Sequence, residues 1–66
     1  MKYYDDKDLV RGLLEISECL FPHQPLDIRL VRRYIQECGL PAYRHKLGWI
    51  ARVGDLRAWR DSFFFE

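Results

Sequence analysis

The sequence LDIRLVRRYIQECGLP, residues 26–41, decides the fold more than any other stretch, because it carries both ends of a helix. Asp27 is a favoured N-cap residue, and Leu26 and Val31 around it are spaced for a hydrophobic staple. Gly39 supplies a left-handed stop, and Pro41 prevents continuation. The apolar residues between these ends recur at helical spacing: Leu30, Val31, Tyr34, Ile35 and Cys38. We therefore predict a helix over residues 26–38.

The residues after Pro41 indicate a hairpin followed by a helix. The segments AYRH (42–45) and WIARV (49–53) flank a Lys46-Leu47-Gly48 turn. Alternation along the second segment predicts that Trp49, Ala51 and Val53 share one face, with Ile50 and Arg52 on the other. An isolated hairpin is only marginally stable in water, so we expect this one to pack against the helices. We predict a hairpin over residues 42–53 and a closing helix over 54–63, whose inward positions are Leu56, Trp59 and Phe63.

The N-terminal segment, residues 1–20, is predicted to contain a helix from Asp6 to Leu20. Its apolar spacing is helical, and three aspartates stand near its start, where the helix dipole favours them. Gly12 weakens this helix by about 1 kcal/mol relative to alanine. Pro22 and Pro25 then break it. A second register, in which Ser17 caps a short helix after an earlier segment, stays open.

The composition predicts one mainly α domain with a small β-hairpin, spanning residues 1–66. The chain is 48% apolar, which suits a compact core, and no apolar run approaches the roughly 20 residues that span a bilayer. The start lacks the features of a secretion signal, and two cysteines are too few for a disulfide scaffold, so we expect a cytoplasmic protein. A zinc site could be drawn from Cys19, His23, Cys38 and His45, but these spacings match no established finger, so we expect no metal and no cofactor.

Charge is distributed unevenly along a chain whose net charge is +1. Residues 1–26 carry three basic and five acidic side chains, whereas residues 27–60 carry eight basic and three acidic ones. An acidic first third and a basic remainder predict a molecule with one positive face.

The order helix, turn, helix, hairpin, helix is the plan of a winged helix-turn-helix domain. Within it, VRRYI (31–35) followed by GLPAYR (39–44) resembles the recognition helix and first wing strand of excisionase-like and MerR-type DNA-binding domains. Trp49, Asp55-Leu56 and Ala58-Trp59 resemble their second wing strand and closing helix. The resemblance covers about residues 26–60. It implies binding of double-stranded DNA, in excision, transcriptional control or DNA packaging.

The residues expected to contact DNA lie on the predicted helix and hairpin. The helix presents one polar stripe opposite Val31 and Ile35: Arg29, Arg32, Arg33 and Gln36. Arginine can grip guanine O6 and N7, and glutamine can grip adenine, so we assign Arg29 and Arg33 to bases or flanking phosphates and Arg32 to a phosphate. The hairpin tip carries Arg44, His45 and Lys46, which suit the neighbouring backbone or minor groove. Arg52 adds a phosphate contact if it points outward.

Two alternatives remain open at this point. The arginine stripe can be an ordinary solvated face, in which Arg29 and Arg33 pair with neighbours such as Glu37. The chain can also be a protein-interaction module, a phage-type adaptor or inhibitor, that uses the aromatic C-terminus. Three adjacent phenylalanines cannot all face inward, so they either cover Tyr3 and Tyr4 or leave Phe64 and Phe65 as a self-association surface, for instance between copies on DNA. We expect no enzyme, since no catalytic constellation can be identified.

Overall fold

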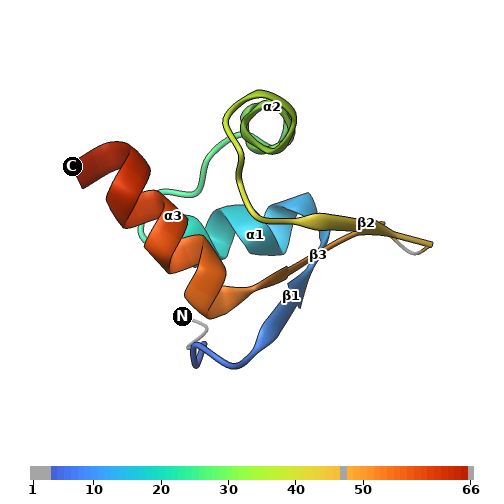
Figure 1. The fold of residues 1–66 in the computed structure, drawn as a ribbon, viewed down its shortest axis with the longest axis horizontal. Helices are drawn as coiled ribbons and strands as arrows, with labels where there is room; N and C mark the ends of the chain where they lie inside the picture. The colour runs from blue at the N-terminus through green and yellow to red at the C-terminus, as the bar shows by residue number, and fades with distance from the viewer. Residues whose placement is uncertain (1–3, 47, 66) are drawn as a thin grey trace.

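The computed structural model describes residues 4–46 and 48–65. Along these ranges the chain forms strand β1 (Leu9–Arg11), helices α1 (Gly12–Leu20) and α2 (Ile28–Glu37), strands β2 (Tyr43–His45) and β3 (Gly48–Arg52), and helix α3 (Val53–Phe65). The predicted class, mainly α with a small hairpin, is confirmed (Figure 1). Residues 1–3 of the predicted N-terminal segment and Leu47 of the predicted turn lie outside the described residues.

The prediction of one helix from Asp6 to Leu20 is wrong over its first part. Residues Leu9–Arg11 form a strand that pairs antiparallel with β3, giving the sheet order β1-β3-β2. Gly12 adopts a φ of +84°, a conformation that favours glycine, where the chain turns from strand into helix. Val10 pairs with Ala51, and both are buried. This pairing with residues 39 to 43 positions away is a tertiary interaction, so it overrides the helical spacing of the local sequence.

The sheet has one covered and one open face. Helix α1 packs against β1 and β3, and α3 packs against β3, so the face that carries Val10 and Ala51 is the inner one. Successive side chains along a strand project from alternate faces of the sheet, and the two residues of a paired position project from the same face. The remaining positions therefore lie on the outer face, which we define by the exposed or half-buried residues Leu9, Arg11, Tyr43, His45, Ile50 and Arg52.

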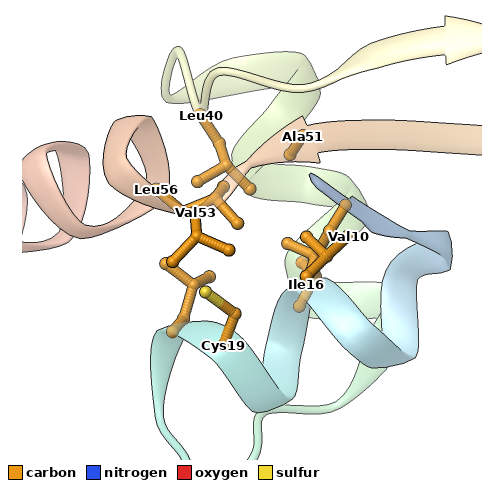
Figure 2. Close-up of a cluster of buried hydrophobic side chains, with 9 residues drawn as sticks. Val10, Ile16, Cys19, Leu40, Ala51, Val53 and Leu56 are labelled. Atoms are coloured by element: carbon orange, nitrogen blue, oxygen red, sulfur yellow. The ribbon is translucent and has the colours of Figure 1, made fainter. Parts of the chain in front are cut away.

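Every helix contributes to a single core on the inner side of the sheet (Figure 2). Ile16 and Leu20 come from α1, Val31 from α2 and Leu56 from α3, and all four are fully buried. Leu40, in the link between α2 and β2, closes the top of this cluster. Because α2 contributes Val31 to a core that the inner sheet face also lines, α2 lies on the same side of the sheet as α1.

The proline-rich loop between α1 and α2 is tied to α1. The hydroxyl of Ser17, which is fully buried, donates a hydrogen bond of 2.7 Å to the backbone oxygen of Leu26. At the end of α1, the N–H of Phe21 donates a hydrogen bond of 3.0 Å to the backbone oxygen of Ser17. Ser17 therefore sits inside α1 as a buried anchor for the loop, and it does not cap a second helix.

The acidic N-terminal segment lies at the start of α3. The N–H groups of Val53 and Gly54 donate to the backbone oxygens of Asp8 and Asp6, each at 3.0 Å. The side chain of Arg57 pairs with the Asp6 carboxylate at 2.7 Å. Negative charge near a helix N-terminus is favourable, so this arrangement suits the dipole of α3. It also keeps these aspartates away from α2.

Gly54 is expected to be intolerant of a side chain. A Cβ there would stand 3.0 Å from the Asp6 oxygen, which is itself held by the Gly54 N–H. Alanine normally stabilises a helix over glycine by about 1 kcal/mol. We expect Gly54→Ala to lower the free energy of unfolding by about 1 kcal/mol instead, measured by urea denaturation. An increase in the free energy of unfolding would show that the contact between the Asp6 backbone and the start of α3 can adjust to a side chain at this position.

Candidate nucleic-acid interface

Helix α2 is held at both ends in a way that fixes which face is exposed. Asp27 caps it by accepting the Arg29 N–H at 2.8 Å. At the other end Gly39 has a φ of +75°, and the N–H groups of Cys38 and Leu40 both donate to the Tyr34 oxygen. With Val31 buried on one side, the opposite side presents an exposed stripe, here called the basic face: Arg29, Arg32, Arg33 and Gln36.

Arg32 lies on the flank of α2 that faces away from α3. Tyr34, on the buried side, packs against the rings of Trp59 and Phe63 in α3. At 3.6 residues per turn, Arg32 lies about 160° around the helix from Tyr34. Figure 1 shows α2 end-on, with the C-terminal half of α3 and the hairpin tip extending to opposite sides of it. Arg32 therefore projects away from α3.

The other two arginines of the basic face are held by carboxylates. The guanidinium of Arg29 lies 3.2 Å from the Asp27 carboxylate, and that of Arg33 lies 3.0 Å from Glu37, one helical turn away. The hydrogen bond from Arg29 lowers the pKa of the Asp27 carboxyl below its ordinary value. All four side chains are exposed, so the guanidinium groups are accessible, and exposed pairs of this kind contribute little to folding stability. Arg32 makes no such ion pair with the residues the structure describes.

The hairpin places Arg44 on the same side of the sheet as α2. Arg44 pairs with Trp49 in the β2–β3 register. Trp49 is two positions before the buried Ala51 in β3, so Trp49 and Arg44 both lie on the inner face. Its guanidinium carbon lies 5.8 Å from the centre of the Trp49 ring, within reach of a cation–π contact. Trp49 is half-buried and packs against the core. His45 pairs with Gly48 and so projects from the outer face, and Lys46 follows at the exposed tip.

Arg52 is not brought together with the other candidate residues. It pairs in register with Leu9, so it projects from the outer face, where Arg11 also lies. The candidate interface therefore consists of the basic face of α2 together with Arg44 and Lys46, whereas His45, like Arg52, lies on the outer face. The acidic N-terminal segment does not cover the basic face, because Asp6 is engaged with Arg57 in α3.

No protein-family model and no solved structure matches the chain. The chain is similar to a 2-deoxystreptamine N-acetyl-D-glucosaminyltransferase from Streptomyces fradiae, with 36% identity over 62 residues. The match covers 82% of this chain but 15% of that enzyme. The chain thus spans a small part of the relative's length, and the similarity is that of a segment.

The C-terminal phenylalanines form an aromatic cluster with α2 and the proline-rich loop. Phe63 stacks on Trp59 with ring centres 4.8 Å apart, and Phe64 meets Phe21 edge-on at 5.3 Å. Phe64 is nevertheless 39% exposed and Phe65 71% exposed. Phe65 borders a hollow of about 340 Å³ that Phe21 and Pro22 also line. Phe63 and Phe64 contact other rings of this cluster, but Phe63 is itself 47% exposed, so its predicted inward position is wrong, and Phe65 is the most exposed of the three.

The cysteines are separate from the candidate interface. Cys19 is buried in the core, and this burial raises the pKa of its thiol, with Arg57 and Arg60 acting in the opposite direction. Cys38 is half-buried, and its backbone oxygen accepts the Trp59 indole N–H at 3.1 Å. Among the described residues, no three histidine, cysteine or acidic side chains gather as metal ligands. In the same part of the chain, no helix is long and apolar enough to cross a membrane.

The sequence predicts the basic residues and one of the two carboxylates that pair with them. The pairing of Arg33 with Glu37 follows from their i,i+4 spacing, which appeared above as an alternative to DNA contact. The double role of Asp27, as helix cap and as partner of Arg29, was not anticipated, although their proximity in the sequence was a visible signal. The contact of Arg44 with Trp49 depends on the strand register, which the sequence left open.

Proposed function

We propose that the protein binds double-stranded DNA through the basic face of α2 and the hairpin beside it. The observation that carries this proposal is the placement of the exposed Arg29, Arg32 and Arg33 on a helix that lies on the same side of the sheet as Arg44. An α-helix fits the major groove, and a neighbouring basic hairpin can contact the flanking backbone. The resemblance to excisionase-like and MerR-type domains supports the same role, which the protein would perform in the cytoplasm.

The similarity to the Streptomyces fradiae enzyme gives no reason to assign a sugar-transfer reaction to this chain. The matched segment is 15% of that enzyme, so its printed activity concerns a much longer protein. A binding role also agrees with the site, since the exposed arginines and lysine are phosphate-contacting groups.

The proposal is tested by the salt dependence of duplex binding. Five cations contribute to the interface: Arg29, Arg32, Arg33, Arg44 and Lys46. If three to five of them neutralise phosphates, a plot of log affinity against log salt should have a slope between about −3 and −4.5. Fluorescence anisotropy with a labelled duplex of random sequence measures this slope.

A matched pair of double variants locates the interface. Arg32→Gln with Lys46→Gln should make the slope shallower by about 2 and weaken binding at least tenfold, because two phosphate contacts are lost. The control, Lys7→Gln with Arg11→Gln, removes the same charge from the N-terminal turn and the outer face, and should change affinity less than threefold. Equal losses in the two double variants, or no duplex binding by the wild type at 50 mM salt, would contradict the proposal.

A second candidate function, protein contact through the C-terminus, is favoured by the exposure of Phe65 beside an apolar hollow. Phe65→Ser tests it better than Phe64→Ser, since Phe64 packs against four aromatic rings. Loss of self-association on duplexes of increasing length, with single-site affinity intact, would support this role. Unchanged stoichiometry would argue against it.

A further inference from the structure

The two carboxylates of α2 hold two of its arginines in a particular geometry. Asp27 contacts the Nε and Nη2 groups of Arg29 at 3.4 and 3.2 Å, while the same carboxylate caps the helix. Glu37 contacts the Nε of Arg33 at 3.0 Å. Both contacts use the side of the guanidinium that carries Nε. These contacts leave the end formed by the two Nη groups available to a ligand, and these arginine side chains are 90% and 70% exposed.

This geometry suits a base better than a phosphate. The end of a guanidinium can donate two parallel hydrogen bonds to O6 and N7 of guanine. Fixing a long side chain before binding reduces the conformational entropy lost when it meets its target. A carboxylate beside the arginine also opposes its attraction to a phosphate, and repels the backbone itself. Asp27 and Glu37 thus reduce the attraction of α2 to phosphates and favour hydrogen bonds between the two arginines and bases.

The spacing along α2 sets the distance between the two base contacts. Arg29 and Arg33 are four residues apart, so they are separated by about 6 Å along the helix. Successive base pairs rise by about 3.4 Å, so a helix lying along the groove reaches guanines about two base-pair steps apart. Arg32, which lacks a carboxylate partner among the described residues, remains suited to a phosphate.

We propose that Asp27 and Glu37 are positioning residues that hold Arg29 and Arg33 for two guanines, so that the interface selects guanine-containing duplex sites. This inference rests on the proposed function, since it concerns how that DNA surface chooses its sequence. In this proposal Arg29 and Arg33 determine the preferred DNA sequence, while Arg32 and the hairpin tip supply affinity for DNA of any sequence.

The experiment is selection from a randomised duplex pool with the wild type and variants of the two carboxylates. The wild type should enrich guanine at two positions about two steps apart. Asp27→Ser keeps a good N-cap but is too short to reach the guanidinium, and should reduce the preference at one of these positions at least fivefold. Asp27→Asn should give an intermediate loss. Glu37→Ala should affect the other position.

Affinity for non-selected DNA separates positioning from a structural role. It should rise in Asp27→Ser and Glu37→Ala, because each removes a negative charge from the surface that meets the backbone. A damaged helix would instead weaken binding to every sequence. Arg11→Gln, on the outer face, should leave the selected sequence unchanged.

Three outcomes would overturn the inference. The first is a wild type that binds duplex DNA without enriching guanine at two positions. The second is retention of the full guanine preference by Asp27→Ser and Glu37→Ala. The third is a uniform loss at every position in both variants. In each of these cases the wild type still binds DNA, so the proposed function survives. Absence of duplex binding by the wild type would overturn both.

Discussion

Leu20→Ala should leave the isolated chain largely unfolded at 25 °C. Leu20 is fully buried where α1 meets the core, and removing a buried leucine side chain costs about 2–5 kcal/mol. A core in a domain of this size rarely supplies more than about 3–5 kcal/mol of net stability. Circular dichroism should therefore show loss of most helical signal, without a cooperative urea transition.

Leu14→Ala provides a matched control, because it makes the same chemical change on the same helix. Leu14 is 62% exposed, and surface substitutions usually change stability by less than about 0.5 kcal/mol. Alanine is also the best helix former. If Leu14→Ala destabilises the chain as much as Leu20→Ala, the face of α1 that is turned toward the sheet has been assigned incorrectly.

The double variant Arg29→Ala with Arg33→Ala should lose nearly all preference for a selected site. Each bidentate arginine–guanine contact discriminates by about 1–3 kcal/mol, so removing two should cost at least about 2 kcal/mol on the selected site. This corresponds to a fall of about 30-fold or more in specific affinity, measured by competition between selected and random duplexes.

Arg32→Ala is the comparison for that double variant. It removes a phosphate contact from the same helix face, so it should weaken binding to selected and random duplexes by a similar factor. The ratio of the two affinities should therefore stay near the wild-type value. Loss of site preference in Arg32→Ala, with preference retained in the double variant, would reverse the roles assigned to these arginines.

The part of the fold that was predictable is the part encoded by local signals. Asp27 and Gly39 mark the ends of α2 by side-chain capping and backbone conformation, which act within a few residues. The predicted range 26–38 contains the observed Ile28–Glu37, and the hairpin and closing helix differ from their predicted bounds by one or two residues at each end. The exposure of the basic face followed from the apolar spacing on the opposite side of α2.

The part that was not predictable depends on distant pairing. The strand β1 has three residues and exists because Val10 is buried opposite Ala51, which no local pattern around Val10 reveals. Gly12 was interpreted as a weak point in a helix, whereas it is the junction between strand and helix. The same register decides the candidate site, since it sends Arg52 to the outer face and Arg44 to the inner one.

The measurement that tests the account most directly is a map of backbone amide shifts during titration with duplex DNA. If the basic face and the hairpin form one surface, the largest shifts should fall in residues 28–37 and 43–46, with small shifts in 9–11 and 63–65. Shifts concentrated in the outer-face strand β1 or at the end of α3, with α2 unaffected, would contradict it.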